Sequence, residues 1–219
     1  MKLYTFHQSG SAYRVRIALN LKGIDYEPVY VVVAPNLPDL NNDEYVKLNP
    51  QRTAPTFVDG DVVLTQSMAI IEYLEEVHPE PALMPKDAAG RARVRTLTQG
   101  IVCDTHPIIS QRIFQSLKTE FDMPENMRNP WNQRWMARGL SIFETMLAES
   151  SATGLFCHGD TPTMADCVLV PQIFTAGRFG LDLAKDYPTI TRIVEHCKTL
   201  KPFIDAAPEN QPDHGAGKH

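Results

Sequence analysis

The sequence lacks paired cysteines. Its four cysteines are widely separated and include no CxxC: Cys103, Cys157, Cys167 and Cys197. In a chain of 219 residues, this spacing is typical of reduced, buried side chains rather than of a disulfide framework or a zinc site. We therefore expect no disulfide bond and no bound metal.

Long apolar runs and an excess of positive charge are also absent. No stretch approaches membrane-spanning length, and the first residues lack the pattern of a secretion signal. The net charge is −5, so no positive field attracts nucleic acid or an anionic membrane. There are no internal repeats or low-complexity segments. A hydrophobic content of 43% is typical of a cytoplasmic globular protein of one large or two small domains.

The most informative stretch is residues 9–19. It follows an apolar run, residues 3–6, that predicts a buried strand. The apolar residues within 9–19 recur at helical spacing. Ser9, Gly10 and Ser11 therefore lie at a strand-to-helix turn, where backbone N–H groups lack partners and the helix dipole favours an anion. A serine here is either a plain N-cap or a hydroxyl donor to a bound anion.

The segments that follow predict an alternation of strands and helices. They are a strand over residues 27–33, loops over 34–50 with a short helix near 43–48, two short strands around Asp59-Gly60 and a helix over 68–76. The first two strands are expected to be parallel because a helix connects them. The order β-α-β-α-β-β-α is the thioredoxin-like arrangement.

Two further positions in this part of the chain suit a ligand. Pro55 begins a strand, and it is either a cis-proline that exposes the N–H and C=O of Ala54 or an edge proline in trans. Gln66 and Ser67 precede the next helix, with Ser67 as the expected cap. Two helix N-termini at neighbouring strand ends suit a zwitterionic or polyanionic ligand.

These residues together resemble the zeta-class glutathione transferases, the group that includes maleylacetoacetate and maleylpyruvate isomerases. The resemblance is carried by Tyr13-Arg-Val-Arg-Ile-Ala-Leu after Ser9, by Ala54-Pro55-Thr56, and by Gln66-Ser67-x-Ala-Ile-Ile-Glu-Tyr-Leu-Glu-Glu. It continues through Gly159–Asp166, Leu169–Gln172, Arg178-Phe179, Asp182-Leu183 and Gln211–Asp213, so that it covers about residues 1–213. It implies an α/β thioredoxin-like N-terminal domain plus an all-α C-terminal domain.

The expected domain boundaries follow from this fold and from the prolines after the helix over 68–76. They are a thioredoxin-like glutathione-binding domain over 1–80, a linker over 81–87, an all-helical substrate domain over 88–207 and a flexible tail over 208–219.

Within the helical domain, a helical pattern from Asp87 toward Leu117 is expected to kink or break at Pro107. Thr163 and Asp166 predict a capping box. A last helix over 188–200 is expected to pack on the first domain.

The resemblance implies roles by position. Ser9 matches the serine that stabilises the glutathione thiolate, and Ser11 is a candidate for a second catalytic hydroxyl. The glutathione-binding candidates are Ser9, Gly10, Ser11, Ala54, Pro55, Gln66, Ser67, His106 and Gln111; the substrate-binding candidates are Gln8, Arg112 and Arg178. The family motif usually reads Ser-Ser-Cys-Ser-Trp-Arg, so Gly10 and Ser11 are departures. Gln8 is another, since maleylpyruvate-type members tend to carry arginine there.

The implied function is the glutathione-dependent conversion of maleylacetoacetate to fumarylacetoacetate in aromatic catabolism, by a cytoplasmic homodimer. The substrate class is a dicarboxylic keto acid, and glutathione is a cofactor that is not consumed. Three alternatives stay open: a maleylpyruvate isomerase, a zeta-like transferase acting on α-halo acids, and a non-catalytic glutathione-binding protein.

Overall fold

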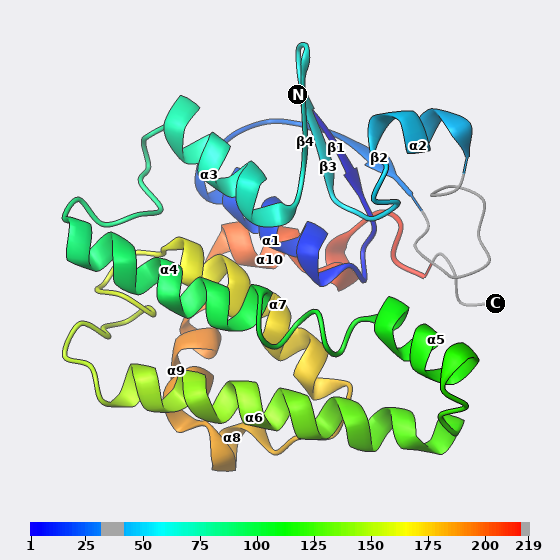
Figure 1. Ribbon diagram of the computed structural model, residues 1–219. Helices are drawn as coiled ribbons and strands as arrows, with labels where there is room; N and C mark the ends of the chain where they lie inside the picture. Colours follow the sequence, from blue (N-terminus) through cyan, green and yellow to red (C-terminus); the bar gives the residue numbers. More distant parts are fainter. Residues whose placement is uncertain (32–41, 216–219) are drawn as a thin grey trace. The chain divides into compact units, whose positions relative to one another are not determined.

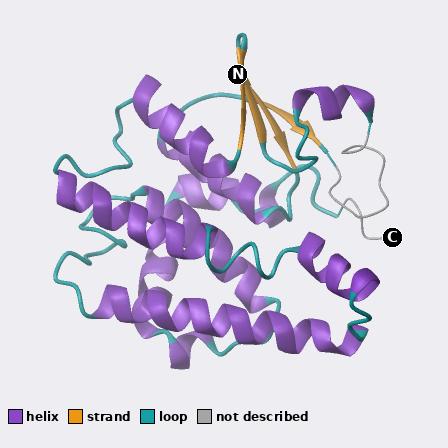
Figure 2. Cartoon of the chain, in the orientation of Figure 1, coloured by secondary structure: helices purple, strands orange, loops and turns teal. Residues whose placement is uncertain are grey.

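The computed structural model describes residues 1–31 and 42–215. The chain divides into two compact units, one of residues 1–83 with 198–219 and the other of residues 84–197. The end of the strand expected over 27–33, the first part of the loop expected over 34–50 and the last four residues of the chain lie outside the described residues. Figure 2 shows helices and strands along the chain.

The first unit contains a four-stranded sheet in the order β2-β1-β3-β4. Strands β1 and β2 are parallel, and β3 is antiparallel to both β1 and β4. This is the thioredoxin-like arrangement that the sequence predicts. Its elements are β1 (Lys2–Thr5), α1 (Gly10–Leu21), β2 (Glu27–Tyr30), α2 (Asp43–Leu48), β3 (Thr56–Asp59), β4 (Val62–Thr65), α3 (Ser67–Val77), α10 (Lys201–Ala206) and the short 3-10 helix η3 (Pro208–Asn210).

The two faces of the sheet are covered by different helices, with α1 and α3 on one side and α2 on the other (Figure 1). Successive side chains of a strand point to opposite faces. In β1, Thr5 therefore faces α1, where it bonds to Arg16, whereas Tyr4 packs with Tyr45 of α2. Helices therefore lie over both faces of the sheet at β1, so the end of this strand is the part left for a ligand.

Helix α1 is anchored at its C-terminal end by a buried lysine. Lys22 precedes Gly23, whose φ of +64° ends the helix. The Lys22 ammonium is fully buried and donates to Glu75 Oε2 at 2.8 Å, to the His78 carbonyl at 2.7 Å and to the Pro81 carbonyl at 2.9 Å. These bonds join α1 to the end of α3 and to the segment that follows it.

The second unit is helical. Its elements are α4 (Ala88–Val102), α5 (Gln111–Glu120), the 3-10 helix η2 (Glu125–Met127), α6 (Arg128–Ala148), α7 (Met164–Gly177), α8 (Leu183–Asp186) and α9 (Pro188–Cys197). Helix α7 packs against α4 and α9, and most of its side chains are buried. The helical pattern was expected to kink or break at Pro107; it does break, but earlier, since α4 ends at Val102 and α5 begins at Gln111.

The capping box predicted at α7 is present. The Asp166 carboxylate accepts hydrogen bonds from the Thr163 N–H at 2.8 Å, the Thr163 hydroxyl at 2.9 Å and the Cys157 N–H at 2.8 Å. Burial raises the pKa of Asp166, and these hydrogen bonds oppose that effect. The carboxylate therefore serves the start of α7.

The C-terminal region differs from the sequence-based expectation. The helix expected over 188–200 ends at Cys197 and packs on α6 and α7, while α10 packs on α1. Pro202 lies in the first turn of α10 and has no N–H to continue a preceding helix, so a new helix begins there. Residues 208–215, expected as tail, are bound to the first unit, as described below.

The cysteines are free, as expected, and three of the four are buried. Cys103 is exposed, which differs from the expectation of burial. Burial raises the pKa of the Cys157 thiol. None of the helices described is both long and apolar enough to span a membrane.

Candidate functional site

The turn between β1 and α1 places Ser9 at the N-terminus of a helix. Ser9 is the N-cap of α1, and its Oγ accepts a hydrogen bond from the Ala12 N–H at 3.2 Å. The same Oγ donates to the Ala54 carbonyl at 3.5 Å. The hydroxyl is thus both a cap and a donor directed away from the helix. Gly10 and Ser11 form the first turn of α1, and Gln8 is half-buried just before Ser9.

The loop before β3 faces this turn. The Ala54–Pro55 peptide bond is cis, as the family resemblance implies. Polar groups of α2 and its C-terminal end hold the loop: the Thr53 carbonyl accepts from Tyr45 Oη and from Asn49 Nδ2, both at 2.7 Å. Asn49 is fully buried. The backbone of Ala54 is therefore held in one place by contacts beneath it.

Helix α3 begins beside the same loop. Gln66 is its N-cap, so the expectation that Ser67 caps the helix was wrong; Ser67 is its first residue. Gln66 has φ +72°, a conformation that costs a non-glycine residue about 1–3 kcal/mol and that is found most often at ligand sites. Its Nε2 donates to Gln51 Oε1 at 2.8 Å, and Ser67 Oγ accepts from Arg14 Nη1 at 3.3 Å.

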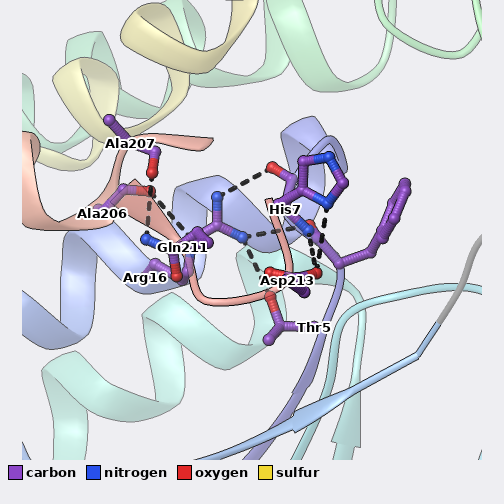
Figure 3. A network of polar contacts seen from close by, with 8 residues as sticks. Thr5, His7, Arg16, Ala206, Ala207, Gln211 and Asp213 are labelled. Carbon is purple, nitrogen blue, oxygen red and sulfur yellow. Dashed lines mark hydrogen bonds and ion pairs between the residues drawn. The ribbon is translucent and has the colours of Figure 1, made fainter. Parts of the chain in front are cut away.

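A buried arginine supports the turn from behind (Figure 3). Arg16 donates from Nε to the Ala206 carbonyl at 3.0 Å, from Nη1 to Thr5 Oγ1 at 3.0 Å and to the Phe6 carbonyl at 3.2 Å, and from Nη2 to the His7 carbonyl at 3.2 Å. Burial lowers the pKa of Arg16 to about 10, so the guanidinium stays charged at neutral pH. Two of the four acceptors are carbonyls of the turn that leads to Ser9.

The other four candidates belong to the second unit. His106 is half-buried in the turns between α4 and α5. Gln111 and Arg112 are exposed in the first turn of α5, and Arg178 is exposed at the C-terminal end of α7, on a different helix. The eight candidates of the first unit lie on three segments that hydrogen bonds and sheet pairing bring together. These four are distributed over two helices and a turn.

The chain resembles known proteins over nearly its whole length. Residues 3–82 match the family described as glutathione S-transferase, N-terminal domain. The chain is 46% identical to a maleylpyruvate isomerase from Ralstonia sp., over 97% of this chain and 99% of that protein. A solved maleyl pyruvate isomerase, described as a bacterial glutathione S-transferase of the zeta class, has a TM-score of 0.92 at 46% identity, with 97% and 99% of the chains covered. The chain belongs to the zeta-class glutathione transferases.

Both isomerase names occur among the relatives of this zeta-class transferase. A maleylacetoacetate isomerase from Methylobacterium extorquens AM1, solved with malonate and GSH, has a TM-score of 0.92 at 38% identity, with 99% and 100% of the chains covered. The family and the fold expected from the sequence are therefore confirmed. The family covers both substrates.

Sequence analysis did not single out the residues that support the site of this zeta-class chain. Arg14 and Arg16 lie within the recognised motif, and both are buried although they are charged. The sequence pattern that could have indicated their role was the occurrence of two arginines in a largely apolar helix. His7, which contacts Asp213, follows the apolar run directly and carried no such signal.

Proposed function

We propose that this chain is a glutathione-dependent cis–trans isomerase of a maleyl keto acid. The observation that carries the proposal is the convergence of three features at the strand ends of the first unit. They are the Ser9 hydroxyl at the start of α1, the cis Ala54–Pro55 bond, and the start of α3 at Gln66. The similarity to proteins named maleylpyruvate and maleylacetoacetate isomerase supports the same reaction.

The donor set fits glutathione, a tripeptide with two carboxylates and a thiol. The first N–H groups of α3 have no partner within the helix, and the helix dipole favours a carboxylate there. The backbone of Ala54, fixed beside the cis bond, offers an N–H and a C=O to the peptide part of the ligand. Gln66 and Ser67 would hold the γ-glutamyl end.

Ser9 supplies the electrostatic part of the mechanism. When bound, glutathione supplies a thiolate that adds reversibly to the cis double bond, so that the bond can rotate and the cofactor is recovered. A free thiol has a pKa of about 8.5 and is mostly protonated at neutral pH. A hydroxyl donor and the positive end of α1 both favour the thiolate. Ser9 is suited to this because its Oγ accepts from the Ala12 N–H, and its O–H, which makes only a 3.5 Å contact with the Ala54 carbonyl, would donate to the bound thiolate instead.

An arginine is the group expected to bind the acidic substrate. Arg178 is exposed at the end of α7. A guanidinium binds a carboxylate with two parallel, charge-assisted hydrogen bonds, which fixes orientation as well as position. We assign Arg178 to a substrate carboxylate, with Gln8 and Arg112 as further substrate contacts and His106 and Gln111 as further glutathione contacts.

A paired assay tests the reaction and its substrate. Maleylpyruvate and maleylacetoacetate are each supplied with glutathione, and the loss of cis absorbance is followed beside the free thiol. The proposal expects isomerisation with the thiol unspent. The 46% identity to a maleylpyruvate isomerase favours a higher kcat/KM for maleylpyruvate than for maleylacetoacetate. Halide release from α-halo acids with loss of thiol identifies a transferase instead, and binding without turnover identifies a non-catalytic protein.

Replacing Ser9 tests the mechanism. Ser9→Ala is expected to lower kcat by roughly 10²–10³, the effect of removing one donor to a developing charge, while the Kd for glutathione changes little. Loss of the cap also costs about 1 kcal/mol of stability, so rates are compared below the unfolding transition. Ser141→Ala, at an exposed serine of α6, is the matched control. Unchanged turnover in Ser9→Ala removes this residue from the mechanism.

The same family resemblance supports a homodimer. Sedimentation equilibrium on the purified chain measures its mass in solution. We expect twice the mass of 24.6 kDa. A single-chain mass at assay concentrations contradicts this part of the proposal.

A further inference from the structure

Residues 208–215, the C-terminal strap, contact the turn that carries Ser9. Asp213 Oδ2 accepts a hydrogen bond from the backbone N–H of His7 at 2.8 Å, and the same oxygen lies 3.4 Å from His7 Nδ1. The side chains of His7 and Asp213 are 1% and 7% exposed. A carboxylate from the far end of the sequence is thus buried against the backbone two residues before Ser9.

Four backbone groups of the turn have identified partners. The Ser9 N–H donates to the Phe6 carbonyl at 3.0 Å and closes the turn. The Phe6 and His7 carbonyls accept from Arg16, and the His7 N–H donates to Asp213. Arg16 therefore holds the turn by donating to two of its carbonyls, and Asp213 holds it by accepting from the His7 N–H. Figure 3 shows the two side chains on either side of the His7 backbone.

The strap is held in a defined position. Gln211 Nε2 donates to the carbonyls of Asp205 at 2.8 Å and Ala207 at 3.1 Å, and the His214 N–H donates to the Gln211 carbonyl at 2.9 Å. The ring of His214 meets that of His7 edge-on, with centroids 5.5 Å apart. The backbone next to Asp213 is thus fixed by the bonds of Gln211, which are independent of the turn.

The charges favour this contact. Burial lowers the pKa of His7 from 6.5, so its ring is neutral at pH 7 and Nδ1–H is the tautomer that suits Asp213. The positive charge of Arg16 lies nearby and attracts the Asp213 carboxylate. Hydrogen bonds to a charged acceptor are about twice as strong as neutral ones. The carboxylate therefore restrains the turn more firmly than a neutral side chain would.

We propose that Asp213 is a positioning residue for Ser9. It fixes the turn of residues 6–9 through the His7 N–H, so that the Ser9 hydroxyl keeps its place at the start of α1 and beside the Ala54 carbonyl. The inference rests on the proposed function, because it assumes that Ser9 stabilises the bound thiolate. A misplaced hydroxyl weakens that stabilisation while leaving the rest of the glutathione site intact.

The test compares Asp213→Ala and Asp213→Asn with Glu209→Gln, an exposed acid on the same strap. The pKa of bound glutathione is read from its thiolate absorbance, beside kcat, KM and Tm. Asp213→Ala is expected to raise the bound thiol pKa and to lower kcat about tenfold, with KM for glutathione changed less than about threefold. Asp213→Asn keeps an oxygen acceptor for the His7 N–H and is expected to recover part of the rate. Glu209→Gln is expected to match the parent.

A purely structural role gives a different result. In that case both Asp213 variants have a lower Tm, but the bound thiol pKa and the kcat of the folded protein are unchanged. That outcome overturns the inference. Because Asp213→Asn preserves the size of the side chain, it serves where Asp213→Ala does not fold.

A double variant separates this inference from the proposed function. If Asp213 acts through Ser9, the Ser9→Ala, Asp213→Ala pair loses no more rate than Ser9→Ala alone, whereas independent losses multiply and overturn the inference. If Ser9→Ala alone leaves turnover unchanged, the proposed role of Ser9 fails first. If Ser9→Ala is impaired and Asp213→Ala is not, only the inference fails.

Discussion

Arg16 in the first unit and Asp166 in the second are both fully buried charged side chains that bind backbone groups. The partners of Asp166 lie within nine residues of it. One partner of Arg16 lies 190 residues away, and two others belong to the turn before Ser9. The two side chains differ in what they stabilise as well as in the sequence separation of their partners. Asp166 starts a helix, whereas Arg16 holds a candidate catalytic turn, so a change at Arg16 is expected to affect chemistry and a change at Asp166 only stability.

Arg16→Met gives the largest expected effect. It leaves four acceptors without their donor, including the carbonyls of Phe6 and His7. We expect a loss of about 3–5 kcal/mol of unfolding free energy, the cost of removing one side of a buried charged network. The remaining folded protein is expected to lose turnover as well. Urea unfolding and kcat below the transition measure the two effects, and full turnover in the folded variant contradicts the assignment of Arg16 to the catalytic turn.

Asp166→Ala is expected to cost about 3 kcal/mol, because it leaves the buried N–H groups of Cys157 and Thr163 unpaired. Unlike Arg16→Met, it is expected to leave kcat of the folded protein unchanged. Asp166→Asn retains an oxygen acceptor and is expected to lose less stability. A fall in kcat with no fall in Tm contradicts the assignment of Asp166 to capping.

Arg178→Ala contrasts these buried charges with a solvent-exposed arginine. Because a surface substitution usually changes stability by no more than about 0.5 kcal/mol, Tm is expected to stay near that of the parent. The KM for the acidic substrate is expected to rise about tenfold, the loss of a charge-assisted hydrogen bond. Arg178→Lys retains the positive charge but cannot make two parallel hydrogen bonds, so its KM is expected to lie between those of the parent and Arg178→Ala. An unaltered KM excludes Arg178 from the substrate site.

Acid is expected to act on the two regions in opposite directions. The pKa of His7 is lowered by burial, so below about pH 6.5 the unfolded chain binds a proton more readily and stability falls. The pKa of Asp166 is raised by burial, so at lower pH, above 3.8, the folded chain binds the proton more readily and stability rises. Tm between pH 7.5 and 5.5 measures the His7 part. His7→Gln is expected to lose less stability on this change of pH, and an equal loss in both proteins refutes the assignment.

Local patterns predicted much of this molecule. The capping box at Thr163 and Asp166 occupies four consecutive residues, and the thioredoxin-like order follows from strand and helix periods within residues 1–76. A break in the helical pattern was predicted from Pro107, and a break is present there, although α4 already ends at Val102. These features depend on residues close together in the chain, so local sequence patterns were sufficient to predict them.

Long-range contacts explain what the sequence did not predict. Gln66, not Ser67, occupies the N-cap position of α3, with a φ of +72° and no capping bond from its side chain, and no local propensity predicts that conformation for glutamine. The strap was expected to be a loose tail because its composition is polar, and only the bonds of Gln211 and Asp213 show that it is fixed. The roles assigned to the candidate site residues remain predictions.

The buried ammonium of Lys22 has a practical consequence. Its three hydrogen bonds occupy all three of its protons, and its side chain has no exposure, whereas the side chain of Lys201 is 83% exposed. An amine-reactive label therefore modifies Lys201 in the native protein and reaches Lys22 only when α1 and α3 separate. Mass spectrometry of the labelled peptides thus gives a built-in reporter of opening in the first unit that needs no substitution.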